Sequence, residues 1–148
     1  MPREPIDTYY LKMLELVASR STCPRRKVAA IITDGSGHIL STGYNGVPSG
    51  YPHCIDKPCP GAGDLPGDSA RCAAVHAEQN ALLQCTALVR ACNIYCTTMP
   101  CFTCAKMIAN TTIRRIIYVN EYPDRKGIIL LEELGREVLS DWEATHGG

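Results

Sequence analysis

The sequence predicts a three-layer α/β sandwich with helices on both faces of a mixed central β-sheet. Helical and strand patterns alternate along the chain, and the run VAAIIT (28–33) is apolar on both faces. A strand that is apolar throughout is typical of a sheet covered by helices on both sides. With 148 residues the chain is long enough to bury a core of its own, so we expect one domain over 1–148.

The first half is expected to contain a helix and a hairpin. Residues 28–33 and 39–44 flank the turn sequence DGSG (34–37), which predicts the hairpin. Residues 45–71 then lose all regular periodicity, and a loop of this length is usually functional or tethered. The helix over 6–20 has an apolar stripe at helical spacing, expected to be buried: Ile6, Tyr9, Met13, Leu14 and Val17.

The second half alternates helices and strands. Residues 73–84 (AAVHAEQNALLQ) are rich in strong helix formers, and 93–97 (NIYCT) form a short strand. Pro100 suits the first turn of a helix and is expected to start one. The elements expected after it are a strand over 113–119, a helix over 126–134 that Gly135 ends, and a strand over 137–139.

Composition excludes several classes of protein. Lys and Arg number 15, as do Asp and Glu, so the net charge is zero and no broad basic face is available for a nucleic-acid polymer. Residues 1–10 lack the apolar segment of a signal peptide, and no apolar run is long enough to cross a membrane. We therefore expect a cytoplasmic protein that acts on a small charged molecule. In that compartment its nine cysteines would not form stable disulfides, and metal binding is the expected reason for so high a count.

Two short motifs supply the ligands of a catalytic zinc site. The sequence HAE begins at His76, and PCFTC ends at Cys104. A catalytic zinc keeps three protein ligands and an open fourth position, which His76, Cys101 and Cys104 satisfy. Glu78 is left as a proton acceptor beside the metal. The alternatives are buried free thiols or a closed structural zinc site, which would normally use a fourth Cys or His.

These motifs carry a family resemblance. H-x-E followed by P-C-x-x-C is the signature of zinc-dependent nucleobase deaminases. The sequence GYNGVPSG (43–50), the phrase VHAEQNA (75–81) and the Cys-rich insert between them resemble the deoxycytidylate (dCMP) deaminases of the cytidine deaminase superfamily. The resemblance extends from the first expected helix to EYPDRKG (121–127). It implies a cytidine deaminase-like fold and the conversion of dCMP to dUMP and ammonia, which supplies dUMP for thymidylate synthesis.

The resemblance also implies roles for individual residues. Zinc would lower the pKa of a water molecule, while Glu78 would take its proton, pass one to N3 of cytosine and later protonate the leaving amine. Asn45 is expected to hydrogen-bond the deoxyribose or base, and Tyr122 to pack on the nucleotide. Arg26 and Arg125 are phosphate candidates, because a guanidinium matches phosphate geometry bidentately. The alternatives are a simple turn at Asn45, core packing for Tyr122 and solvated charges for the arginines.

Four further cysteines flank or lie in the irregular loop. Some dCMP deaminases carry a second, structural zinc near this position, which implies a site formed by Cys23, Cys54, Cys59 and Cys72. His53 could replace one of the four, and scattered free thiols are the alternative. The remaining cysteines are expected to be buried without a ligand role: Cys85, Cys92 and Cys96.

The resemblance finally implies regulation. Many dCMP deaminases are hexamers that dCTP with Mg²⁺ activates and dTTP inhibits. We therefore expect a homo-hexamer with a regulatory nucleotide site around Asn45, Gly46 and Ser49. Three rival functions remain: a deaminase of free cytidine or deoxycytidine, a deaminase of a base in RNA, and a zinc-binding interaction module without catalysis. The neutral charge disfavours the RNA substrate, and the module would have no use for Glu78.

Overall fold

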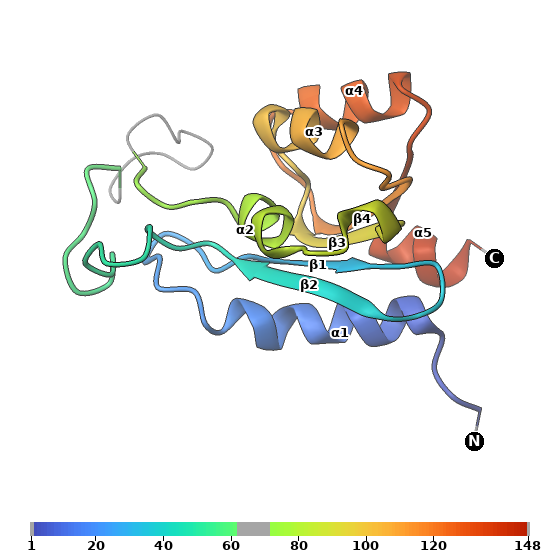
Figure 1. The fold of residues 1–148 in the computed structure, drawn as a ribbon, viewed down its shortest axis with the longest axis horizontal. Coiled ribbons are helices and arrows are strands. Elements are labelled where there is room, and N and C mark those ends of the chain that lie inside the picture. Colours follow the sequence, from blue (N-terminus) through green and yellow to red (C-terminus); the bar gives the residue numbers. More distant parts are fainter. Residues whose placement is uncertain (1, 62–71, 148) are drawn as a thin grey trace.

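The computed structural model describes residues 2–61 and 72–147, and this part of the chain forms a five-stranded sheet with helices on both faces (Figure 1). The strands are β1 (Ala29–Thr33), β2 (Ile39–Tyr44), β3 (Asn93–Thr98), β4 (Arg115–Asn120) and β5 (Glu137–Ser140). The helices are α1 (Ile6–Ala18), α2 (Ala77–Gln84), α3 (Phe102–Ala109), α4 (Lys126–Glu133) and α5 (Asp141–His146), with a 3-10 turn, η1, at Leu88–Arg90.

The sheet is mixed, as the sequence predicts. Its strand order is β2-β1-β3-β4-β5, with β1 antiparallel to both neighbours and β3, β4 and β5 parallel. Parallel neighbours need crossover connections, which α3 and α4 provide. Every residue of β1 is buried, which agrees with its apolar sequence and its place inside the sheet.

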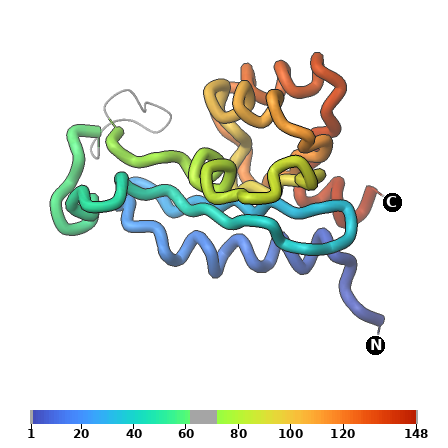
Figure 2. Tube along the Cα trace, viewed as in Figure 1, coloured from blue at the N-terminus to red at the C-terminus, as the bar shows by residue number. Residues whose placement is uncertain are grey.

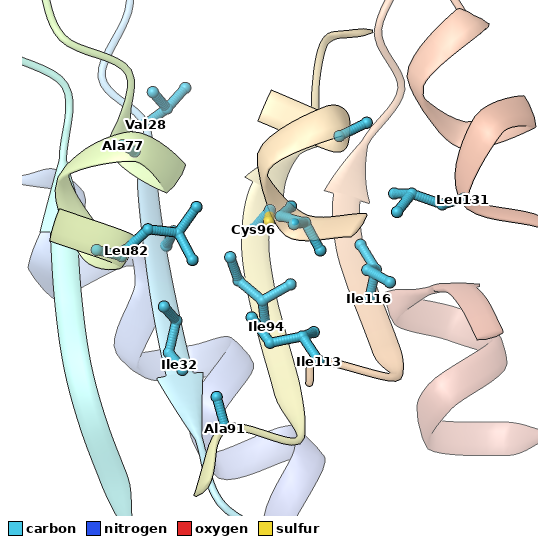
Figure 3. Packing of buried hydrophobic residues seen from close by; sticks show 14 residues of the cluster. Val28, Ile32, Ala77, Leu82, Ala91, Ile94, Cys96, Ile113, Ile116 and Leu131 are labelled. Atoms are coloured by element: carbon cyan, nitrogen blue, oxygen red, sulfur yellow. The ribbon is translucent and has the colours of Figure 1, made fainter. Parts of the chain in front are cut away.

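The larger core cluster lies between the sheet and the helices α2, α3 and α4 (Figure 3). Ile32, Ile94 and Ile116 project from three strands, and Leu82 and Leu131 meet them from α2 and α4. Fully burying one such side chain contributes about 1.5–3 kcal/mol. This packing therefore fixes α2 and α3 on one face of the sheet.

Helix α1 covers the opposite face, with the N-terminus at one end of the molecule (Figures 1 and 2). The predicted buried stripe is wrong at Ile6 and Tyr9, which are 51% and 49% exposed, and is confirmed at Leu14, which is buried. The Tyr10 hydroxyl donates to the Gly37 carbonyl at 2.6 Å, and its ring packs on that of Tyr95. These contacts explain why Tyr10 is buried and the adjacent Tyr9 is not. The fully buried side of α1 is formed by Tyr10, Leu14 and Ala18.

Helix α2 begins at Ala77, four residues later than predicted. Val75 pairs with Gly46 in an antiparallel bridge, and His76 keeps an extended backbone with φ −66° and ψ 152°. This pairing removes residues 73–76 from the helix. His76 consequently becomes the N-cap residue.

Helix α3 also begins later than predicted. Pro100 lies before the helix instead of in its first turn, and Cys101, with φ −71° and ψ 172°, is the N-cap residue. The i and i+3 relation of Cys101 and Cys104 is retained across the first turn. Because α2 and α3 both begin later than predicted, the predicted ligands His76 and Cys101 are the N-cap residues of these helices.

Two elements were not predicted, η1 and α5. The Ser140 hydroxyl accepts from the Glu143 backbone N–H, and the Glu143 carboxylate accepts from the Ser140 backbone N–H. The sequence contains the S-x-x-E signature of this reciprocal capping box, but the helix that it begins is short and was not predicted. No helix within residues 2–61 and 72–147 is both long and apolar enough to cross a membrane.

Candidate zinc centre

Three side-chain donors converge where the N-termini of α2 and α3 meet. His76 Nδ1 lies 3.2 Å from Cys104 Sγ and 3.5 Å from Cys101 Sγ. All three donor atoms lie within 4.8 Å of one another, and no other group of His, Cys, Asp or Glu in the described ranges is as compact. Zinc bonds of about 2.3 Å to sulfur and 2.0–2.1 Å to nitrogen put tetrahedral N and S atoms about 3.6 Å apart. The observed spacing fits zinc and leaves its fourth position open.

The backbone at each helix start holds these donors in place. The His76 N–H donates to Gln79 Oε1 at 3.0 Å, while the His76 carbonyl accepts from Asn80. The Cys101 carbonyl accepts the first hydrogen bond of α3, from Ala105, at 2.8 Å. Gln79 was not singled out from the sequence, because His is not a usual N-cap residue and the capping-box pattern begins with Ser or Thr.

The hydrogen bond between the two thiols shifts their pKa values in opposite directions. A hydrogen bond from the Cys104 thiol lowers the pKa of Cys101 to about 4, and His76 lowers it further. The same hydrogen bond, together with burial, raises the pKa of Cys104. The hydrogen bond to Cys101 also raises the pKa of His76. The site thus holds one thiolate before metal arrives, and a cation needs to displace only the second thiol proton.

Glu78 lies in the first turn of α2 and is only 7% exposed. Burial raises its pKa to about 7, and a hydrogen bond with Cys104 opposes that rise. Glu78 is not one of the three clustered donors. A buried carboxyl with this pKa can take up and release protons near neutral pH.

Arg26 and Tyr122 contact each other and interact electrostatically with residues of the centre. The Arg26 guanidinium carbon lies 5.5 Å from the centroid of the Tyr122 ring. The charge of Arg26 acts to lower the pKa of His76, and after burial the charge of Cys101 contributes most to raising that of Tyr122. Both side chains are therefore electrostatically coupled to the donors.

The other predicted nucleotide contacts lie in different surroundings. Arg125 is 51% exposed, with its Nη1 3.8 Å from Glu121 Oε1. Arg25, which the sequence did not distinguish from its neighbours, affects the pKa of Tyr122 and donates to the Gly61 carbonyl at 3.0 Å. The sequence Arg25-Arg26-Lys27 was the available signal.

Asn45 is buried and holds the segment that carries Arg26. Its Oδ1 accepts from the Val28 N–H and its Nδ2 donates to the Arg26 carbonyl, both at 3.0 Å. Gly46 is paired with Val75, whereas Ser49 is exposed. The amide of Asn45 therefore orders the backbone beside the centre.

The four cysteines of the irregular region form a looser group. Cys23, Cys54 and Cys59 are buried and Cys72 is half-buried. The Cys59 N–H donates to Cys54 Sγ at 3.2 Å, and the side chains of Cys54 and Cys72 both hydrogen-bond that of Cys59. Cys23 acts electrostatically on Cys54 and Cys72. Their pairwise interactions bring three separate segments together.

His53 and the three remaining cysteines differ in burial. His53 is 62% exposed, with its Nδ1 4.0 Å from Asp56 Oδ2. Cys96 is buried as predicted, but Cys85 and Cys92 are only half-buried. Helical and strand periodicity could not predict the burial of Cys85 and Cys92, because both residues lie just outside the helices and strands.

Comparisons with known proteins agree with this geometry. Residues 5–120 match the family described as cytidine and deoxycytidylate deaminase zinc-binding region. The chain is 39% identical over 129 residues to the deoxycytidylate deaminase of Mycobacterium phage D29, covering 82% of this chain and 99% of that one. It is 36% identical over 135 residues to the deoxycytidylate deaminase of Saccharomyces cerevisiae, covering 87% of this chain but 42% of that one.

A solved structure is similar over nearly the same length. The dCMP deaminase from cyanophage S-TIM5, in complex with dCMP and dUMP, superimposes with a TM-score of 0.77 at 35% identity, covering 95% of this chain and 99% of that one. The fold, the compact His-Cys-Cys donors and the family match lead to one conclusion. The chain belongs to the cytidine and deoxycytidylate deaminase family of zinc-dependent enzymes.

Proposed function

We propose that this chain hydrolyses dCMP to dUMP and ammonia. The observation that carries the proposal is the buried carboxyl of Glu78 beside the His76, Cys101 and Cys104 donors. A non-catalytic zinc module would gain nothing from burying a carboxyl that is not a ligand, since desolvating it is unfavourable. The relatives named deoxycytidylate deaminase support dCMP as the substrate.

The chemistry depends on proton transfer by Glu78. Zinc bound by the three donors would supply a Lewis acid that makes water a stronger acid. Glu78 takes a proton from the attacking water and delivers it to N3 of cytosine as the new C–O bond forms at C4. It then carries the second water proton to the amine, and the C–N bond breaks to release ammonia. Its pKa of about 7 suits both directions of transfer.

We propose that Arg26 binds the 5′-phosphate and that Tyr122 packs on the nucleotide. The stacked pair lies beside the donors, and a guanidinium can form two parallel hydrogen bonds to phosphate. Arg125 is the weaker candidate, because its interaction with Glu121 is at the surface. Asn45 would act chiefly by ordering the Arg26 segment through the two hydrogen bonds described above, leaving one amide N–H and one lone pair for a sugar or base.

We further propose a structural zinc held by Cys23, Cys54, Cys59 and Cys72. Four thiolates are a typical ligand set for structural zinc, and the four side chains already interact in pairs. Backbone donors around Cys59, first among them Ala73, lower its pKa, which favours the thiolate that a metal requires. The exposed His53 is left out of this set.

We also propose a homo-hexamer with regulation by dCTP and Mg²⁺ as activator and dTTP as inhibitor. The proposed regulatory residues are Asn45, Gly46 and Ser49. Gly46 and Val75 exchange backbone hydrogen bonds of 3.2 and 2.7 Å, and Val75 immediately precedes His76. A ligand that moves residues 45–49 could thereby bias the centre, with a coupling of about 1–3 kcal/mol.

One assay tests the substrate. Ammonia release should be measured on dCMP, deoxycytidine, CMP and dCTP with zinc-loaded protein. We expect kcat/KM to be far higher for dCMP, because remote phosphate binding is used to position the cytosine ring. Equal values for dCMP and deoxycytidine would assign the chain to the nucleoside deaminases. Repeating the dCMP curve with dCTP and with dTTP tests regulation, and one unchanged hyperbola would refute it.

A further inference from the structure

Gly127, the second residue of α4, packs directly against the backbone that presents Cys101. A Cβ atom at Gly127 would lie 2.6 Å from the Pro100 carbonyl oxygen and 2.8 Å from that of Cys101. Real Cβ atoms essentially never approach other atoms within 3.0 Å, and backbone atoms cannot rotate away as a side chain can. Helix α4 therefore reaches the ligand segment through a contact that only glycine allows.

The atoms that Gly127 contacts also determine the geometry of both thiols. The Cys101 carbonyl accepts the first hydrogen bond of α3, from Ala105, and Cys104 lies within that turn. A displacement of this carbonyl would move Cys101 and tilt the turn that carries Cys104. Alanine favours helix more than glycine does, so glycine here is unfavourable for α4 itself. Its presence is explained by the close packing on Pro100 and Cys101.

Gly43 in β2 has the same relation to α2. Its Cβ would lie 2.4 Å from the Ala77 carbonyl oxygen and 2.5 Å from the Ala81 nitrogen. Ala77 is the residue between His76 and Glu78, so any shift there moves both. The Ser41 hydroxyl holds the same helix by donating to the Ala81 carbonyl at 2.6 Å.

We propose that Gly43 and Gly127 are positioning residues that set the two halves of the zinc centre at their binding distance. One half, with His76 and Glu78, rests on β2 at Gly43, and the other, with both cysteines, rests on α4 at Gly127. Metal geometry tolerates errors of only about 0.5 Å in ligand placement, which is the size of shift that an added methyl group would cause at these contacts. The inference rests on the zinc centre of the proposed function and not on the identity of the nucleotide.

The test compares Gly43→Ala and Gly127→Ala with a matched control, Gly35→Ala. A Cβ at Gly35 would meet only Cys92 Sγ, at an ordinary 3.5 Å, and the Gly35 backbone is not in the left-handed region. Zinc affinity is measured by competition with a chromophoric chelator. The ligand geometry is read from the absorption bands of the Co²⁺-substituted protein, and folding from circular dichroism.

We expect both test variants to fold and to bind zinc roughly 10- to 100-fold more weakly than Gly35→Ala, with shifted cobalt bands. A folded variant with the zinc affinity and cobalt spectrum of Gly35→Ala would overturn the proposal for that glycine. A variant that folds only with metal is judged by its cobalt spectrum. One that stays unfolded in excess zinc would assign the glycine to the whole fold and also overturn the proposal. Because metal binding is the readout, a wrong substrate assignment would leave this result unchanged.

Discussion

The two groups of cysteines differ in how the fold holds them. Cys101 is the N-cap residue of α3 and Cys104 lies in its first turn, and their sulfurs converge with His76 Nδ1 inside 4.8 Å. Cys23, Cys54, Cys59 and Cys72 come from irregular segments and interact in pairs without reaching that compactness. A helix turn preorganises ligands before metal binds, whereas ligands on loops are ordered with the metal. The first arrangement suits catalysis and the second suits folding.

The largest effect is expected at the catalytic group. Glu78→Gln keeps the shape of the side chain but cannot transfer protons, so kcat should fall by about 10²- to 10⁴-fold. Zinc content, measured by elemental analysis, should equal that of the wild type and of Glu133→Gln, which alters an exposed carboxylate on α4. Loss of zinc in proportion to activity would make Glu78 a support of the metal instead.

The next largest effect is expected in the pH dependence of thiol alkylation, which should differ between Cys101 and Cys54. In metal-free protein Cys101 is already a thiolate at pH 6, because its pKa lies near 4, so its rate should change less than about twofold up to pH 8. Burial raises the pKa of Cys54, so its rate should rise about tenfold per pH unit over the same range. Mass spectrometry of iodoacetamide-labelled peptides gives both rates. Parallel pH profiles for Cys101 and Cys54 would contradict the difference.

A smaller effect is expected at the phosphate. Arg26→Ala should raise KM for dCMP roughly tenfold and leave deoxycytidine nearly unaffected, because a charge-assisted hydrogen bond contributes about 1.5–3 kcal/mol. Arg125→Ala should have less effect, and Arg20→Ala, an exposed control, none. Initial rates measured with dCMP and with deoxycytidine test this prediction. A larger effect from Arg125 than from Arg26 would assign the phosphate to Arg125 instead.

The smallest effect on catalysis is expected from a substitution in the group of four cysteines from the irregular segments. Cys59→Ser is expected to lower zinc from two ions per chain to one and to reduce Tm by at least ~4 °C, since a structural metal contributes folding free energy. The kcat should stay within twofold. Cys92→Ser, which changes a half-buried thiol outside both groups, serves as the control. One zinc per chain in fully loaded wild type would refute the second site.

Sequence reasoning succeeded where chemistry is local. The motifs containing His76, Cys101 and Cys104 predict a single site, and the structure brings these donors together. The apolar run of β1 predicts a strand inside the sheet, which is confirmed. It failed where tertiary contacts determine which of two adjacent residues is buried. Tyr9 and Tyr10 are equal in periodicity, and only the packing on Tyr95 and Gly37 selects Tyr10.

The helix starts show the same limit. His76 and Cys101 are unusual N-cap residues with extended backbones, and the strand-like pairing of Val75 accounts for that of His76. Arg26 and Arg125 were equal candidates, and their neighbours in space, Tyr122 and Glu121, distinguish them. Glu121 is four residues from Arg125, whereas the contact of Arg26 with the distant Tyr122 cannot be read from local sequence.

The bridge between Gly46 and Val75 has a consequence for evolution and engineering. It joins the two ends of the intervening chain by paired backbone hydrogen bonds, immediately before the centre begins. Lengthening a chain whose ends are already joined costs little entropy, roughly 0.6 kcal/mol for a doubling. The length of the chain between these two residues can therefore change at little entropic cost, because the bridge keeps the backbone before His76 in register.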